Sequence, residues 1–406
     1  MKRCIATTDT GKMHGQPVVV VGGGIGGLTA ALCFAFHGAR VTVLEQAPAL
    51  TEVGAGLQIT PNGAVVLARL GLGAAVKAAG IRAQAVCPTD AVSGRRLARF
   101  DLTRLSGEPY RFLHRADLLG LLAKVCQLHG VAVRTGVKVV GVDGGQLRLS
   151  HGDIHPAAFI VGADGVHSVL RPYVNDPGTP FFTGQVAWRA VVQADAPPEA
   201  RIWMAPGRHV VTYPLTQGRL NIVAVQEQAA WAPDGWSHDD DPMAMQSTFA
   251  DTCPDLQAIL ARVTQTRKWG LFRHAVAAQW HKDNIALIGD AAHPTLPFLA
   301  QGANLAIEDA WVLASVCDRG MGLPAYQVLR RARVERAIAA ANANARNYHL
   351  AGARRVVAHA GLRVLGAVAP NAFLRRMDWL YGRDVTRDWG MLLKPAQVSS
   401  SIHTGT

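Results

Sequence analysis

Two kinds of apolar stretch follow one another near the start of the chain. Val18 to Val21 form an uninterrupted apolar run, which is typical of a strand buried on both faces. A longer apolar run follows from about Ile25 to His37, and Gly38 stands at its end, as expected for a helix that stops there. Val41 to Leu44 then predict a second strand. The pattern therefore predicts a strand, a helix and a second strand in direct succession.

Three glycines connect the first strand to the helix. Gly22, Gly24 and Gly27 give the spacing G-x-G-x-x-G, in which the first glycine makes the tight turn, the second lets the backbone approach a pyrophosphate, and the third lets the helix pack closely against the strand. The N-terminus of the helix presents free N–H groups and a positive dipole end to the phosphates. Glu45, 18 positions after Gly27, is placed to accept hydrogen bonds from a ribose. Together these features predict a dinucleotide-binding site instead of a simple glycine-rich turn.

Helical and strand patterns continue along the rest of the chain. Helices are expected near 61–70, 117–128, 304–316, 324–347 and, more weakly, 354–380, with a β-rich region from about 180 to 228 and a polar loop from Asp234 to Pro242. The predicted fold class is α/β, with a Rossmann-like nucleotide-binding domain, an inserted β-sheet substrate domain and a helical C-terminal segment. The first domain is discontinuous and takes residues 1–75, 100–175 and 270–320, the inserted domain takes 76–99 and 176–268, and the C-terminal segment takes 321–395.

Composition and charge narrow the function classes. The net charge is +12, but the basic residues form only short pairs such as Arg95–Arg96. This pattern favours a solvated basic surface over a nucleic-acid-binding one, and such a surface attracts anionic ligands. The six cysteines are dispersed without a C-x-x-C pair, so neither a metal site nor a disulfide framework is predicted, and a reducing cytoplasm is expected. The uncharged run from Gln16 to Phe36 contains five glycines, which a buried strand, turn and helix explain better than an integral membrane segment.

Two later segments each end a predicted strand with an aspartate beside a glycine. One runs from Phe159 into Asp164–Gly165, and the other runs from Ile285 into Gly289–Asp290. Each alone is compatible with an ordinary turn. Their occurrence after a G-x-G-x-x-G, in this order and spacing, closely resembles the class A flavoprotein aromatic hydroxylases, whose fingerprints are G-x-G-x-x-G, a D-G motif and a G-D motif. The resemblance covers residues 17 to 385.

The resemblance implies an FAD cofactor and residues that hold it. Gly22, Gly24, Gly27 and Glu45 match the positions that hold the ADP half, and the loop that begins at Gln46 is expected beside it. Arg115 matches an arginine that reaches the pyrophosphate, Asp164 belongs to the D-G motif near the same region, and Asp290 matches the aspartate that hydrogen-bonds the ribityl chain. The segment 294–304 matches the loop that lines the isoalloxazine ring, with Pro297 at the oxygen-reacting edge and backbone N–H groups at Gly302 and Ala303 facing the pyrimidine edge.

Two further segments point to one branch of this family. Ala300-Gln301-Gly302 stands where many members have Gly-Gln-Gly, and it resembles the branch of salicylate, 3-hydroxybenzoate and 6-hydroxynicotinate hydroxylases more than the ubiquinone-biosynthesis branch. The segment from Gly207 to Leu215 resembles that branch's strand, on which alternation points His209 and Tyr213 to the same face. A histidine can take a phenol proton and a tyrosine can hydrogen-bond the phenolate or carboxylate, so both are candidate catalytic residues. The sequence leaves two roles open for Arg189, which are packing and binding of a substrate carboxylate.

The activity that the resemblance implies is hydroxylation of a phenolic or hydroxy-heteroaromatic acid by an FAD-dependent monooxygenase, with NADH or NADPH and O2, through a flavin C4a-hydroperoxide. Because one G-x-G-x-x-G is present, the nicotinamide donor is expected to bind transiently. Such chemistry needs an apolar cavity, and the candidate walls are Leu296, Phe298, Leu299, Val211 and Trp203. Two alternatives are a monooxygenase or epoxidase that tailors a larger secondary metabolite, and a flavin-binding protein without oxygenase activity. The identity of the acid, the ring position and the oligomeric state, with a homodimer possible, stay open.

Overall fold

A six-stranded sheet forms the first layer of the molecule. The computed structural model describes residues 11–50, 55–155, 157–175, 178–231, 237–296 and 298–387. The strand order in this sheet is β19 (His281–Lys282), β20 (Ile285–Leu287), β12 (Phe159–Gly162), β1 (Pro17–Val21), β2 (Arg40–Leu44) and β8 (Ala132–Arg134). All neighbours are parallel except β19 and β20. The central position of β1 explains its four buried valines, because both faces of a parallel sheet are covered.

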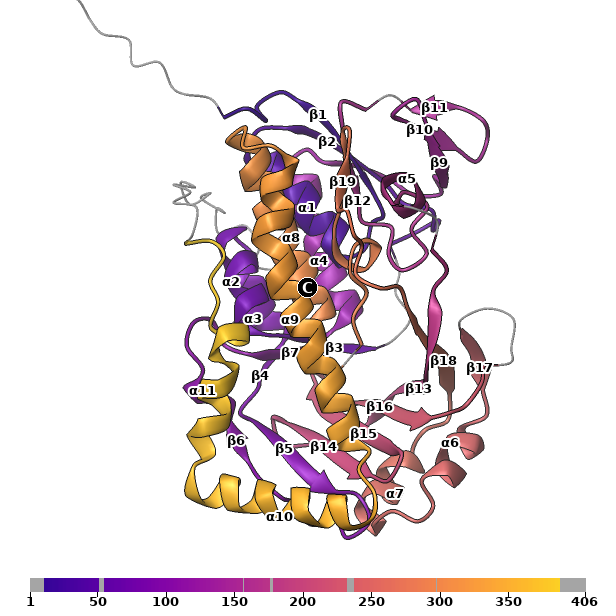
Figure 1. Ribbon diagram of the computed structural model, residues 1–406, viewed down its shortest axis with the longest axis vertical. Helices are drawn as coiled ribbons and strands as arrows, with labels where there is room; N and C mark the ends of the chain where they lie inside the picture. The colour runs from indigo at the N-terminus through magenta and orange to yellow at the C-terminus, as the bar shows by residue number, and fades with distance from the viewer. Residues whose placement is uncertain are drawn as a thin grey trace, which may run out of the picture.

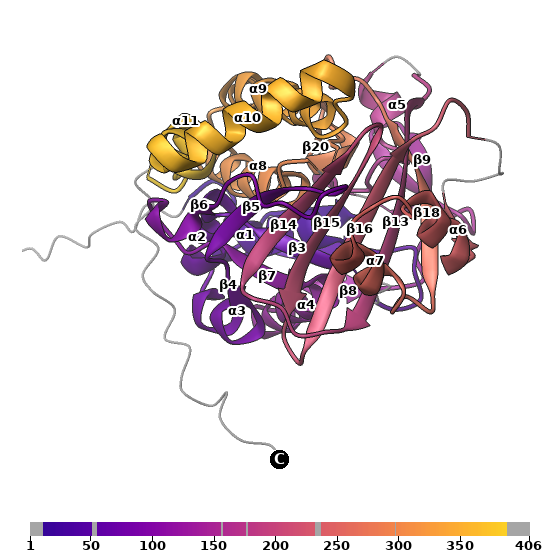
Figure 2. The same cartoon turned by 90° about the horizontal axis from the view of Figure 1, so that it is seen from below.

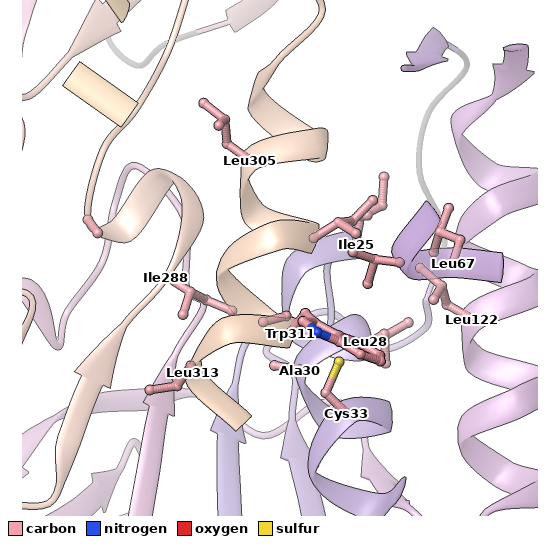
Figure 3. Packing of buried hydrophobic residues seen from close by; sticks show 14 of the residues in the cluster. Ile25, Leu28, Ala30, Cys33, Leu67, Leu122, Ile288, Leu305, Trp311 and Leu313 are labelled. Carbon is pink, nitrogen blue, oxygen red and sulfur yellow. The ribbon is translucent and has the colours of Figure 1, made fainter. Parts of the chain in front are cut away.

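Helices pack closely on this sheet. α1 (Ile25–Phe36) lies between α8 (Gly302–Asp318) and α4 (Arg115–Leu128). Figure 3 shows Trp311 of α8 beside Leu28 of α1, and both side chains are buried. The helix α1 carries no charged residue, which suits a helix that is enclosed on nearly every side.

An eight-stranded sheet forms the second large layer. Its order is β17 (Ser237–Asp240), β18 (Thr266–Arg273), β13 (Phe181–Gln193), β16 (Arg219–Glu227), β15 (Arg208–Leu215), β14 (Glu199–Ala205), β5 (Ala85–Asp90) and β6 (Phe100–Asp101). The short helices α6 (Pro242–Thr248) and α7 (Pro254–Leu260) cover its outer face (Figure 2). Trp203 packs in this outer cluster with Met245 and Phe249, so the expectation that Trp203 lines the cavity is wrong. Side chains along a strand alternate between the two faces of a sheet, and Trp203 stands at a position whose side chain points to the outer face.

Smaller elements join the two layers. One three-stranded sheet consists of β3 (Gly56–Ile59), β7 (Arg111–His114) and β4 (Ile81–Arg82), and another of β11 (Ile154–His155), β10 (Gln146–Leu149) and β9 (Val139–Asp143). The helices α2 (Pro61–Arg69), α3 (Gly73–Ala79) and α5 (Arg171–Val174) are short. α2 packs against α8, which brings two distant segments to one side of the molecule.

Three helices complete the described chain. α9 (Leu323–Tyr348) runs beside α8 and extends toward the eight-stranded sheet, where α10 (Gly352–Val368) crosses the end of the molecule and α11 (Pro370–Tyr381) turns back (Figure 1). Among the described residues no single helix is long and apolar enough to cross a membrane; α10 and α11 meet that test only as a pair bent by 97°.

The predicted α/β class with a helical C-terminal segment is confirmed, while some local predictions are wrong. The segment from Asp234 to Pro242 was expected to be a polar loop, but Ser237–Asp240 form β17 by pairing with β18. Apolar and polar residues do not alternate clearly in this segment, so the strand is recognised only from its pairing with β18. The helices α6 and α7 were not predicted. The division into domains stays a prediction.

Candidate active site

A cavity of about 630 Å³ lies between the two large layers. Most of the residues predicted from the sequence line it together: Gly22, Gly24, Glu45, Gln46, Arg115, Asp164, His209, Tyr213, Asp290, Gly302 and Ala303. Gly27 is not among the lining residues, and Pro297 lies outside the described residues. Segments nearly 270 positions apart in the sequence, from Gly22 to Asp290, therefore meet at one cavity.

The glycine turn has the close contacts that its spacing predicts. Gly22 has a φ of +103°, and a Cβ there would lie 2.4 Å from the carbonyl oxygen of Ala163. A Cβ at Gly27 would lie 1.9 Å from the carbonyl oxygen of Gly22, so this glycine allows the helix to approach the strand. A Cβ at Gly24 would meet no atom within 4 Å, because this position opens into the cavity at the N-terminus of α1. The turn thus leaves space for a phosphate at the first turn of α1, where backbone N–H groups have no acceptor within the helix.

Glu45 is held by the backbone around it. One carboxylate oxygen accepts a hydrogen bond from the Gly23 N–H at 2.6 Å, and the other accepts one from the Ala47 N–H at 2.8 Å. Each oxygen can accept a further bond, so both can still receive a ribose hydroxyl. The side chain is therefore fixed in place before any ligand binds.

The two motif aspartates differ in their surroundings. Oδ2 of Asp164 accepts hydrogen bonds from the N–H groups of Val169 at 2.8 Å and Leu170 at 3.2 Å, and burial raises the pKa of this carboxyl. Its Oδ1 is buried and has no hydrogen-bond partner within the described residues, as expected at a site that a polar ligand completes. Asp290 is exposed toward the cavity. Desolvation of the carboxyl by the surrounding protein raises the pKa of Asp290, whereas electrostatic interactions with His293 and Arg115 act to lower it.

One face of β13, β15 and β16 forms the opposite wall. Arg189, His209 and Tyr213 line the cavity from this wall among the apolar side chains Val211, Val223 and Val225. His209 is 2% exposed, and burial together with His349 lowers the pKa of its imidazole well below the ordinary range. Burial raises the pKa of Tyr213, although Arg189 and a hydrogen bond with Gln58 act against this rise. His209 is therefore a neutral base at neutral pH, and Tyr213 keeps its phenol proton.

Hydrogen bonds that the sequence analysis did not predict hold the loop before α8. Gln301 donates hydrogen bonds to the carbonyl oxygen of Leu299 and the hydroxyl of Thr60, both at 3.2 Å. Asn304 accepts a bond from the Thr60 N–H at 3.0 Å. Ala300 has a φ of +56°, a conformation that favours glycine and that explains why this position admits glycine in the pattern G-Q-G. The loop is thus anchored to α2 and bent by a strained residue.

A buried charge cluster lies behind the same loop. Arg330 donates to Asp309 at 2.7 Å and also pairs with Glu308, and Arg333 donates to Glu308 at 2.7 and 2.8 Å. His293 lies 2.5 Å from Asp309. The signal for this cluster is present in the sequence as two adjacent carboxylates in the middle of a mostly apolar helix, since buried charges require partners.

Comparison with known proteins identifies the group that this cavity accommodates. Residues 16–341 match the FAD binding domain family. A 3-amino-4-hydroxybenzoate 2-monooxygenase of Streptomyces platensis is 35% identical over 91% of this chain and 96% of its own length. A 3-hydroxybenzoate 6-hydroxylase of Polaromonas naphthalenivorans is 33% identical over 91% and 96% of the two chains.

Solved structures have the same fold. Klebsiella pneumoniae HpxO, crystallised with FAD and uric acid, superposes with a TM-score of 0.78 at 25% identity, over 89% of this chain and 95% of its own. A salicylate hydroxylase substrate complex superposes with a TM-score of 0.76 at 23% identity, over 92% and 97% of the chains. The open glycine turn, the fixed carboxylate of Glu45 and the unsatisfied oxygen of Asp164 fit a dinucleotide in the cavity. The chain therefore belongs to the FAD-dependent aromatic hydroxylases, a family of flavoprotein monooxygenases.

Proposed function

We infer that this chain hydroxylates a phenolic or hydroxy-heteroaromatic acid with NADH or NADPH and O2. The observation that carries this inference is the wall formed by Arg189, His209 and Tyr213, in which a cation, a neutral base and a phenol face the cavity among apolar side chains. A small aromatic acid offers a carboxylate, a hydroxyl group and an apolar ring, which match these three kinds of group. The relatives named for hydroxybenzoates support the same class of substrate.

The sheet register fixes the geometry of this wall. Arg189 on β13 is paired with Val223 on β16, and Val223 is paired with Val211 on β15. His209 and Tyr213 stand two residues on either side of Val211, so they project to the same face. We expect the carboxylate of the substrate to lie toward Arg189 and its hydroxyl group toward His209, because charge-assisted hydrogen bonds orient a planar acid strongly.

The protein's own groups then perform binding and proton transfer. FAD, when bound, supplies the redox chemistry with oxygen. His209 removes the hydroxyl proton of the substrate, which raises the electron density of the ring, and the phenol of Tyr213 donates a hydrogen bond to the resulting oxyanion. The apolar wall keeps water away from the reacting ring.

The residues proposed to hold FAD form groups, each of which would contact a different part of the cofactor. Gly22, Gly24, Gly27, Glu45 and Gln46 would hold the ADP half, with Arg115 and Asp164 near the pyrophosphate. Asp290 would hold the ribityl chain, and the backbone of Gly302 and Ala303 would face the flavin ring. The supporting observation is that all of these residues except Gly27 line the cavity.

A homodimer and a cytoplasmic location are further proposals. On α10, Val356, Val357, Val364 and Val368 are 62–80% exposed, which supports burial of this helix against a second copy of the chain. The described cysteines are free thiols, in keeping with a reducing compartment. Light scattering of the FAD-loaded protein tests the first proposal, and a monomeric mass at every concentration would reject it.

The proposed activity is tested by a screen of aromatic acids. Each acid is added to the FAD-loaded protein with NADH or NADPH, and both donor consumption and the product are measured. We expect a hydroxybenzoate or hydroxynicotinate to stimulate donor consumption and to yield a hydroxylated product. Donor oxidation without a hydroxylated product from any acid would reject the proposal.

A further inference from the structure

His209 is the first member of a chain of three side chains that leads out of the cavity. Its Nδ1 lies 2.7 Å from Nε2 of His349, and Nδ1 of His349 lies 2.9 Å from Oε1 of Glu227. The three residues come from β15, the end of α9 and the end of β16. The side chain of His349 is 2% exposed and that of Glu227 is 57% exposed, so the chain runs from the buried ring of His209 to solvent.

The hydrogen bonds determine which nitrogen of His209 is free to act. The carboxylate of Glu227 can only accept, so Nδ1 of His349 donates to it. In neutral His349 the lone pair is then on Nε2, which must accept from Nδ1–H of His209. His209 therefore presents the lone pair of Nε2 to a ligand in the cavity. This tautomer is the one that a proton acceptor requires.

Backbone contacts hold the three side chains in register. The Gly207 N–H donates to the carbonyl oxygen of His349 at 3.1 Å, and the Glu227 N–H donates to the carbonyl oxygen of Gly207 at 2.9 Å. Gly207 has a φ of +67°, as needed for the turn between β14 and β15. The turn next to His209 thus fixes both of its partners, so the alignment does not depend on side-chain packing alone.

We propose that His349 and Glu227 are positioning residues that relay the substrate's hydroxyl proton from His209 to solvent. The substrate O–H bond breaks as N–H forms at Nε2 of His209. The Nδ1–H bond of His209 breaks as N–H forms at Nε2 of His349, and the Nδ1–H bond of His349 breaks as O–H forms on Glu227, which releases the proton to water. No electrons change hands, and reversal of the three transfers returns a proton to the product oxygen and restores the starting tautomers. This relay rests on the proposed function of the cavity.

The electrostatic surroundings favour outward movement of the proton. Burial and His349 lower the pKa of His209, so a positive charge is unstable at this ring. Burial also lowers the pKa of His349, but the hydrogen bond to Glu227 acts to raise it. The other rings against His209 are Phe298 at 5.5 Å and Tyr348 at 5.2 Å, and burial raises the pKa of Tyr348, so it stays neutral. Among these described contacts the one anion is thus Glu227, which stands at the outer end of the chain of three side chains.

The test uses FAD-loaded protein with a bound phenolic acid and no reductant, so that no turnover occurs. 3-Hydroxybenzoate is the first probe, or the acid selected by the screen above. Its phenolate absorbs at longer wavelength than its phenol, so a stopped-flow pH jump reports proton exchange between the bound acid and solvent. Glutamine at position 349 can still accept a hydrogen bond from His209, but it cannot relay a proton. His349→Gln therefore separates relay from simple orientation.

We expect His349→Gln and His349→Ala to slow the exchange about tenfold or more, with unchanged FAD content and probe affinity. Added imidazole should restore the rate in His349→Ala, and Glu227→Gln should also slow the exchange. The control Glu335→Gln removes a half-exposed carboxylate on α9 that pairs only with Arg331 in the described contacts, and it should exchange at the wild-type rate. Wild-type exchange in His349→Gln would overturn the relay.

His209→Gln separates failure of the relay from failure of the proposed function. If this variant exchanges slowly while His349→Gln exchanges at the wild-type rate, His209 is the base and the relay is rejected. If His209→Gln itself exchanges at the wild-type rate, both the base and the relay are rejected.

Discussion

His293 Nε2 lies 2.5 Å from Oδ2 of Asp309, and this buried contact joins the turn after β20 to α8. The same oxygen accepts a hydrogen bond from the Gly289 N–H at 3.1 Å, and the other oxygen accepts one from Arg330 at 2.7 Å. Burial alone would raise the pKa of Asp309, but His293 and Arg330 lower it to about 2. Asp309 thus positions the G-D turn that carries Asp290 into the cavity.

Replacing Asp309 is expected to destabilise the protein strongly. Asp309→Ala removes the acceptor of His293 and one of the two carboxylates that pair with Arg330 in a fully buried site, and loss of one partner of such a pair costs about 3–5 kcal/mol. Urea unfolding followed by circular dichroism measures this loss. The control Glu335→Gln disrupts a partly exposed pair with Arg331 and should change stability by less than about 0.5 kcal/mol. Equal stability of the two variants would contradict the role of Asp309.

Asp290→Asn is expected to weaken FAD binding without unfolding the protein. Its carboxylate is exposed toward the cavity, and a hydrogen bond to a charged group contributes about 1.5–3 kcal/mol. The dissociation constant for FAD should therefore rise about 10- to 100-fold, as measured by titration of the apoprotein with FAD. Asp153→Asn, on an exposed turn, is the matched control. An unchanged dissociation constant in Asp290→Asn would remove this residue from the cofactor site.

Ala300→Gly is expected to stabilise the loop before α8. A left-handed conformation costs a residue with a Cβ about 1–2 kcal/mol, and the greater chain entropy of glycine offsets part of this gain. We expect an increase of up to about 1 kcal/mol in the free energy of unfolding. Ala339→Gly, at an exposed position inside α9, should have the opposite sign, with a loss of about 1 kcal/mol. The prediction fails if both substitutions lower stability.

His209 should make stability depend on pH on the acid side of neutrality. Its pKa in the folded protein lies well below the ordinary value of 6.5, so the unfolded chain binds a proton more readily. Its contribution is present above pH 6.5 and is lost as the pH falls toward the folded pKa, by at most about 1.4 kcal/mol per pH unit. Thermal unfolding between pH 7.5 and 5.5 should therefore show a smaller loss in His209→Gln than in the wild type. Parallel curves would mean that the pKa of His209 is not depressed.

Local patterns in the sequence were sufficient for much of this site. Gly22 and Gly24 come directly after β1, and their role in the turn depends on backbone geometry within a few residues. His209 and Tyr213 were predicted to share a face because a strand has a period of two, and both line the same wall. The assignment of Trp203 failed because the phase of a neighbouring strand relative to this wall is set by pairing between strands.

Contacts between distant segments were not predictable in the same way. His349 meets His209 across 140 positions, and Asn304 meets Thr60 across 244 positions. No periodicity within a segment encodes such pairs, since they arise when α9 and α8 dock on other elements. The partners of Asp309 were hidden for the same reason, although a carboxylate inside an apolar helix signals that some partner exists.

Product analysis under oxygen-18 gas tests the central claim most directly. The FAD-loaded protein is incubated with NADH or NADPH and a hydroxybenzoate, and the product is examined by mass spectrometry. The wall of Arg189, His209 and Tyr213 predicts a ring-hydroxylated acid that carries one heavy oxygen atom, with a much lower yield per donor oxidised in His209→Gln. Complete donor oxidation with no labelled acid, for every hydroxybenzoate and hydroxynicotinate tried, would contradict the claim that this cavity hydroxylates a phenolic acid.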